Sequence, residues 1–199
     1  MRILFVVFFI AVSLMGCAHY QATSLTPISI KTSDETPTHG ILVAAKAFTK
    51  AESIRYLDRD LMRKGYQPIQ LSIENISDKT YMFSTSRVHL ALASPEEVAQ
   101  KAHTSTLGRI TGYGAAALIA TPLFIIPAVV DGYQSLHANS ALDKDFQGKA
   151  AKDQILAPFS QSHMLLFVPV ESMQDSFTMV LLDEKTNKPL RILVPIKNA

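Results

Sequence analysis

The chain has 199 residues, with 19 lysines and arginines against 17 aspartates and glutamates, and a formal net charge of +2 at neutral pH. This length suits one domain with a substantial core, and the near balance of charge argues against a nucleic-acid partner, which would need a clustered basic surface. The sequence holds one cysteine. A disulfide within the chain is therefore excluded, and ordinary packing has to hold the core together.

The N-terminus has the pattern of a secretory signal peptide that ends at the single cysteine. Arg2 is followed by an apolar run from Ile3 to Met15, which only Ser13 interrupts. A positive charge, a short apolar stretch and a small residue before the cut are typical of such peptides. The run is shorter than the roughly 20 residues that a membrane-spanning helix needs. We therefore predict that residues 1–16 are removed as a signal peptide.

Leu14, Met15, Gly16 and Cys17 resemble the lipobox of bacterial lipoproteins, in which Leu, a small or apolar residue, and Gly or Ala precede the cysteine. The resemblance implies that Cys17 carries a diacylglyceryl group and an N-acyl chain, and we expect no other cofactor. In enterobacterial lipoproteins an Asp after the cysteine retains the protein at the inner membrane. By that resemblance Ala18 favours the outer membrane, facing the periplasm, with the inner membrane as the alternative. An uncleaved N-terminal anchor with an incidental cysteine is the other interpretation.

The first part of the mature chain is predicted to be a linker that leads into the folded domain. Residues 17–38 comprise the lipidated cysteine and a segment rich in Ser, Thr and Pro, a composition that is typical of a flexible tether. The folded domain is expected over residues 39–199. The apolar run Ile41–Phe48 has the length of a strand. It is followed by Thr49-Lys50-Ala51-Glu52, which fits a capping box at the start of a short helix.

Alternating apolar residues predict several short strands. Ile69, Leu71 and Ile73 alternate with polar residues, as in a half-buried strand. Further strands are expected near residues 81–83, 88–92, 164–168, 177–182 and 190–196. About seven short strands with turns between them are typical of an antiparallel sandwich. The pattern resembles the small Ig-like domains of secreted bacterial proteins. The predicted fold class is therefore mainly β with an α insertion (α+β), an antiparallel Ig-like β-sandwich interrupted by a helical hairpin.

The helical hairpin is predicted at about residues 94–149. Ser94-Pro95-Glu96-Glu97 is a strong helix start, and the first helix is expected to run to about Ala120. Pro122 would end it. Pro127 can begin a second helix that ends near Gly148, a candidate C-cap residue. The tip of the hairpin would then lie between the two prolines.

Residues 110–130 contain no charged side chain, and the segment is nominally long enough to span a bilayer. Its two prolines break a helix, and its glycines and alanines add little transfer energy. Three interpretations stay open: the tip packs as core, it docks a protein partner or a second copy, or it dips into the bilayer. The candidate membrane or partner contacts are Leu118, Ile119, Leu123, Phe124, Ile125 and Ile126.

No catalytic or metal-binding constellation is predicted. The six histidines lack the paired spacing of a metal site, although His103 and His137 lie on the two predicted helices and could face each other. Neither a Gly-x-Ser-x-Gly nor a Ser-x-x-Lys motif is present. The densest basic cluster could meet anionic headgroups or glycan, but two aspartates among its residues favour a mixed solvated face. It consists of Arg55, Arg59, Arg63 and Lys64.

These observations favour a non-enzymatic lipoprotein of the cell envelope. We expect a structural or accessory protein that presents a protein-binding module, with a protein partner or self-association in the envelope. One alternative is a membrane-active protein, or a pore or secretion-system accessory, that uses the apolar segment 110–130. A second alternative is a lipid-anchored envelope hydrolase. It would need a cleft in which polar groups converge.

Overall fold

The computed structural model describes residues 20–28, 37–103 and 125–197, and for residues 125–135 it describes the backbone alone. The chain divides into two compact units. One comprises Ala22–Ala102 and Asp145–Ala199, and we call it the β unit. The other comprises Met1–Gln21 and His103–Lys144. The strands of the described residues all belong to the β unit.

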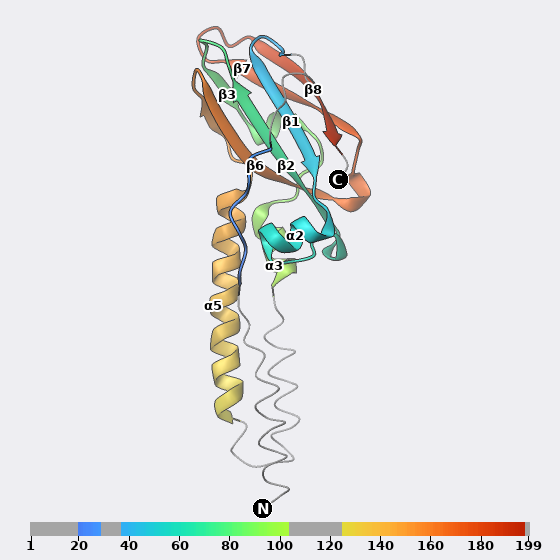
Figure 1. Ribbon diagram of the computed structural model, residues 1–199, viewed down its shortest axis with the longest axis vertical. Helices are drawn as coiled ribbons and strands as arrows, with labels where there is room; N and C mark the ends of the chain where they lie inside the picture. The colour runs from blue at the N-terminus through green and yellow to red at the C-terminus, as the bar shows by residue number, and fades with distance from the viewer. Residues whose placement is uncertain (1–19, 29–36, 104–124, 198–199) are drawn as a thin grey trace, which may run out of the picture. The chain divides into compact units, whose positions relative to one another are not determined.

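The described part of the β unit contains eight strands in one sheet, of order β5-β3-β7-β8-β1-β2-β6, with β4 paired to β7 (Figure 1). All pairs are antiparallel except β1 with β8, and the sheet is nearly closed into a barrel. The strands are β1 (Ile41–Ala47), β2 (Tyr66–Asn75), β3 (Tyr81–Phe83), β4 (Val88–His89), β5 (Gln154–Leu156), β6 (Ser160–Pro169), β7 (Ser176–Asp183) and β8 (Pro189–Lys197).

The predicted mixed fold with mainly antiparallel strands is confirmed, but the two separate sheets of an Ig-like sandwich are replaced by one continuous sheet. The reason is the parallel pair between β1 and β8, where Ala45 lies opposite Ile196. This pair joins the group β1-β2-β6 to the group β3-β7-β8. The two end strands then come near each other, and the Ser162 hydroxyl of β6 donates to the Gln154 side-chain oxygen of β5 at 3.1 Å.

Three α-helices and three short 3₁₀ helices complete the described residues. The α-helices are α2 (Lys50–Leu57), α3 (Pro95–Ala102) and α5 (Ile125–Lys149). The 3₁₀ helices are η1 (Met62–Lys64), η2 (Thr85–Arg87) and η4 (Val170–Ser172). Helix α2 follows β1 directly and lies at the end of the β1–β2 pair (Figure 1). None of the helices in the described residues combines the length and apolar character needed to cross a bilayer.

The helices match the sequence pattern in part. Helix α2 begins with the predicted capping box at Thr49 and Glu52. Helix α3 begins as expected after Ser94 but ends at Ala102, so the prediction that it continues to Ala120 was wrong. Residues 104–124, which include the first half of the predicted hairpin tip, lie outside the described residues. Helix α5 runs to Lys149, which places Gly148 inside its last turn instead of at the cap.

Strands β1 and β2 and the second half of β6, Met164 to Val168, are largely buried on both faces, whereas β8 alternates between buried and exposed residues. On β2, Leu71 faces the core, and its neighbour Ser72 on the opposite face is also fully buried. The strand predicted at residues 69–73 is therefore confirmed, but the prediction that it is half-buried was wrong. Other elements cover the outer face. The ring of Phe146 in the last turns of α5 stacks on Phe167 of β6 at 5.6 Å between centroids.

The turn before β1 depends on Gly40. Its φ is +79°, and an added Cβ would lie 2.7 Å from the Cβ of Ser77. Gly65, at the end of η1, has φ +89° but open space around its Cα. We expect Gly65→Ala to lower the free energy of unfolding by about 1 kcal/mol through the left-handed backbone. Gly40→Ala should cost about 2–4 kcal/mol, because the clash adds to that strain.

Urea unfolding followed by circular dichroism measures both losses. The Gly65→Ala variant controls for backbone strain without a clash. Equal losses in the two variants would show that the turn around Ser77 yields to the added methyl group.

Candidate functional site

Residues 22–28, which we call the strap, run over the β unit without forming a helix or a strand. Every third residue of the strap, namely Ala22, Leu25 and Ile28, is apolar and half-buried, and the polar residues between them are exposed. A repeat of three residues is that of polyproline II, in which one side of an extended chain faces its support. The strap was predicted to be part of a tether, yet in the structure it is bonded to the folded unit.

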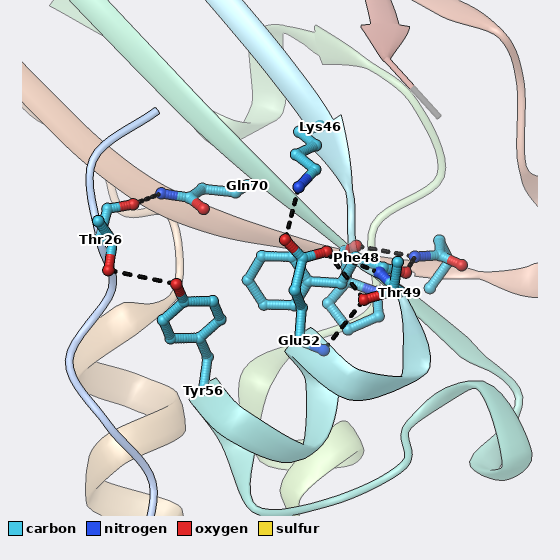
Figure 2. Close-up of polar contacts among 9 residues, drawn as sticks. Thr26, Lys46, Phe48, Thr49, Glu52, Tyr56 and Gln70 are labelled. Atoms are coloured by element: carbon cyan, nitrogen blue, oxygen red, sulfur yellow. Dashed lines mark hydrogen bonds and ion pairs between the residues drawn. The ribbon is translucent and has the colours of Figure 1, made fainter. Parts of the chain in front are cut away.

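Two threonines of the strap make five hydrogen bonds with the rest of the β unit. The Thr23 N–H and hydroxyl both donate to the Arg55 carbonyl, at 3.0 and 3.1 Å. The Lys149 ammonium donates to the Thr23 carbonyl at 2.8 Å. Figure 2 shows Thr26 between two side chains: the Tyr56 hydroxyl donates to its Oγ1 at 3.2 Å, and the Gln70 amide donates to its carbonyl at 2.8 Å.

The strap completes the C-terminal end of α2. The last carbonyls of a helix have no partner within the helix and need one from elsewhere. Thr23 supplies donors to the Arg55 carbonyl, and the Lys149 ammonium donates to the Tyr56 carbonyl at 2.6 Å. A cation at this position also interacts favourably with the helix dipole. The strap, α2 and the end of α5 therefore meet at one point.

Through its ammonium, Lys149 contacts the strap, α2 and the last turns of α5. Its side chain is 11% exposed, and the ammonium has three acceptors: the Thr23 and Tyr56 carbonyls and the Asp145 carboxylate at 2.6 Å. An ammonium has three N–H donors, so the three acceptors satisfy it fully. A buried charge that lost an acceptor would be costly. Lys149 therefore favours the arrangement in which the strap is in place.

The direction in which Tyr56 points is fixed by the start of α2. The Thr49 hydroxyl accepts from the Glu52 N–H at 3.1 Å, and the Thr49 N–H donates to the Glu52 carboxylate at 2.9 Å. Lys46 of β1 pairs with the same carboxylate at 2.5 Å, as Figure 2 shows. Burial raises the pKa of Glu52, but the hydrogen bonds from Lys46 and Thr49 outweigh it and hold the pKa below its usual value.

Aromatic packing completes this corner of the β unit. The Tyr56 ring lies 5.3 Å from the Phe48 ring, measured between centroids. Phe48 itself is held by a backbone hydrogen bond to the Pro68 carbonyl at 2.9 Å. Tyr56 is buried with its hydroxyl turned to the strap. The aromatic ring and the Gln70 amide therefore form a surface with apolar contact area and few, directed polar groups.

A serine–histidine contact that the sequence analysis missed lies on the same outer face of β2. The Ser72 hydroxyl and His163 Nδ1 are 2.5 Å apart, on paired residues of β2 and β6. Burial lowers the pKa of His163, and the nearby charge of Glu74 only partly offsets this. A neutral imidazole accepts from the serine hydroxyl. Ser72 is fully buried, so its hydroxyl is not placed to attack a substrate.

The predicted lipobox and the candidate membrane or partner contacts fall largely outside the described part of the chain. This holds for the lipobox residues Leu14, Met15, Gly16 and Cys17, and for Leu118, Ile119, Leu123 and Phe124 of the apolar segment. Ile125 and Ile126 form the start of α5, where the structure describes the backbone alone.

The basic cluster near α2 mixes with acids and other groups. Arg59 pairs with the Asp58 carboxylate at 2.7 Å, and Lys50 pairs with Asp60 at 3.6 Å. The Arg55 guanidinium lies 5.4 Å from the centre of the Tyr56 ring. These three contacts all involve the basic cluster or its neighbouring aspartates, as expected for a surface of mixed charge.

His103 has a carboxylate partner: its Nε2 lies 2.6 Å from Asp143 Oδ1. His137 is exposed on α5. Over the described residues, no group of three or more His, Cys, Asp or Glu side chains is placed to hold a metal ion.

A separate cavity of about 270 Å³ lies beside the start of α3 and β6, lined mainly by apolar residues such as Leu92, Pro95 and Phe167. Thr85 and Ser94 bring hydroxyl groups to it. Pockets that bind small molecules usually have volumes of roughly 300 Å³ or more, and several polar groups point into them. The cavity is therefore a less well-formed site than the strap and the surface beneath it.

No family model matches the chain, and searches of curated proteins and of solved structures likewise found no match. The contacts described above are therefore the basis for a functional proposal.

The lowered pKa of His163 predicts a pH dependence of stability. Because the pKa in the folded state lies below that of the unfolded chain, the unfolded state binds the proton first as the pH falls. The stabilisation is complete above the unfolded value of about 6.5 and is lost progressively below it. We expect the free energy of unfolding to fall between pH 7.5 and 5.5, and His163→Gln to remove part of this slope.

Urea unfolding at several pH values measures the slope. His89→Gln, at an exposed position on β4, serves as the matched control for loss of an imidazole, and the slope of His163→Gln is compared with it. An unchanged slope in His163→Gln would contradict the assignment.

Proposed function

We propose that the chain is a lipid-anchored protein of the cell envelope, at the outer membrane and facing the periplasm, and that its β unit is a non-enzymatic binding module. The lipobox pattern at Leu14–Cys17 supports the anchor. Each buried CH₂ adds about 0.8 kcal/mol, so three acyl chains on Cys17 would make attachment effectively permanent. The observation that carries the proposal is the docking of the strap close to that cysteine.

The docked strap limits how far the β unit can lie from the membrane. Thr23, which is bonded to α2, follows Cys17 by six residues. An extended chain spans at most about 3.6 Å per residue, so Thr23 lies within about 20 Å of the lipidated residue. A free tether to residue 38 would instead allow about 75 Å. The docked strap therefore favours a module that meets its partner next to the bilayer, such as another envelope protein.

The anchor is tested by metabolic labelling with an alkyne fatty acid in the native host or in a Gram-negative expression host that has the lipoprotein-processing enzymes. Cys17→Ser should abolish label incorporation and leave an unprocessed or unanchored chain. Met15→Ala is the matched control, because it changes a lipobox position but keeps the thiol, and it should be labelled like the wild type. Equal labelling and migration of Cys17→Ser would overturn the proposed anchor.

A second test separates a lipid-only anchor from a membrane-active protein. If lipid on Cys17 is the membrane contact, a chain without residues 1–16 and with Cys17→Ser should stay at the bottom of a liposome flotation gradient. Flotation that Phe124→Asp abolishes would favour the membrane-active alternative. Phe159→Asp is the control for loss of an aromatic side chain, because Phe159 is 76% exposed on the β5–β6 turn.

A further inference from the structure

We propose that the surface beneath the strap is a binding groove for an extended, uncharged peptide segment of a partner protein, and that residues 22–28 occupy this groove in cis. The inference rests on the proposed function only in taking the β unit as a binding module. The groove consists of Arg55 and Tyr56 of α2, Gln70 of β2 and Lys149 of α5, the residues that bond to the strap.

The groove recognises main chain more than side chain. Arg55 accepts from the Thr23 N–H, Lys149 donates to the Thr23 carbonyl, and Gln70 donates to the Thr26 carbonyl. Any extended segment presents such groups, so these contacts do not restrict the occupant to the strap. Aromatic surfaces with a few directed polar groups are also the usual receptors of polyproline II segments. The groove therefore suits extended chains as a class.

Side chains of the strap define the chemistry of the segment that fits. Its apolar residues recur at every third position, as Leu25 and Ile28 do, and the positions between them are exposed. The threonine hydroxyls at positions 23 and 26 meet the Arg55 carbonyl and the Tyr56 hydroxyl. No residue of the strap is charged. The expected partner segment is therefore uncharged, with apolar residues three apart and hydroxyl residues beside them.

A partner segment is favoured over the strap of a second copy by effective concentration. The strap is joined to its own groove by a short connection, which raises its local concentration to the millimolar range. An identical strap from another copy makes the same contacts without that advantage and cannot compete. A foreign segment with better contacts can displace the strap, and displacement would also free residues 22–28 to extend the reach from Cys17.

The test measures binding of a fluorescent synthetic peptide with the sequence of residues 20–28 to the mature chain carrying Cys17→Ser. Two variants release the strap from its groove. Thr23→Pro removes the N–H and the hydroxyl that bond to Arg55, and Leu25→Asp places a charge at a half-buried position. The matched controls are Ser24→Pro and Ser24→Asp, because Ser24 is exposed and makes none of the described hydrogen bonds.

Both releasing variants should bind the peptide at least about tenfold more tightly than the wild type and the two Ser24 variants, because the competing cis segment is lost. Adding Gln70→Ala to a releasing variant should weaken binding by about two- to tenfold, the effect of one hydrogen bond. Thermal unfolding checks that every variant is folded, and the two independent releasing changes guard against failure of either one.

Absence of peptide binding by folded Thr23→Pro and Leu25→Asp chains would overturn the proposal, as would equal binding by all variants. Concentration-dependent dimers of the wild type that Thr23→Pro abolishes would also overturn it, since the groove would then join two copies. Acyl labelling of Cys17 does not depend on the groove. Failure of this inference is therefore distinguishable from failure of the proposed anchor.

Discussion

The burial of strands β1 and β2 and of the second half of β6 on both faces is the constraint on which the rest of the β unit depends. The inner face packs into the nearly closed sheet through residues such as Leu71 and Ile73, and the outer face carries Gln70 and Ser72, which are also buried. Buried polar groups need partners. The strap provides one for Gln70, and His163 provides one for Ser72. The outer cover of the sheet is thus specified by polar contacts as well as by packing.

Lys149 couples that cover to the helices. One buried ammonium bonds to the strap, to the end of α2 and to Asp145 of its own helix. Because each acceptor comes from a segment with its own constraints, a change in one contact is felt by the others. The capping box of α2 and the packing of Tyr56 on Phe48 also help to hold the strap, because they position the tyrosine hydroxyl next to Thr26.

The same strap connects the anchor to the binding module in our proposals. On the proposed anchor, a segment that is bonded six residues after Cys17 would keep the β unit near the bilayer, and a segment that leaves its groove would give the unit more reach. Five hydrogen bonds and three half-buried apolar residues oppose the entropy of ordering seven residues. Terms of this kind are of similar size in proteins, so the net free energy that holds the strap is small and a segment with better contacts can exceed it.

Local patterns in the sequence were sufficient to predict the capping box at Thr49, strand β1, the hairpin of β7 and β8, and most of helix α5, because each depends on neighbouring residues. The single sheet, the Ser72–His163 contact and the docked strap were not predictable in this way. Ser72 and His163 are 91 residues apart, and the alternation at Gln70 and Ser72 is the same whether a strand faces water or a covering segment. Only the tertiary structure decides whether that face is exposed to water or covered, because burial of a polar residue depends on a partner whose position the local sequence does not determine.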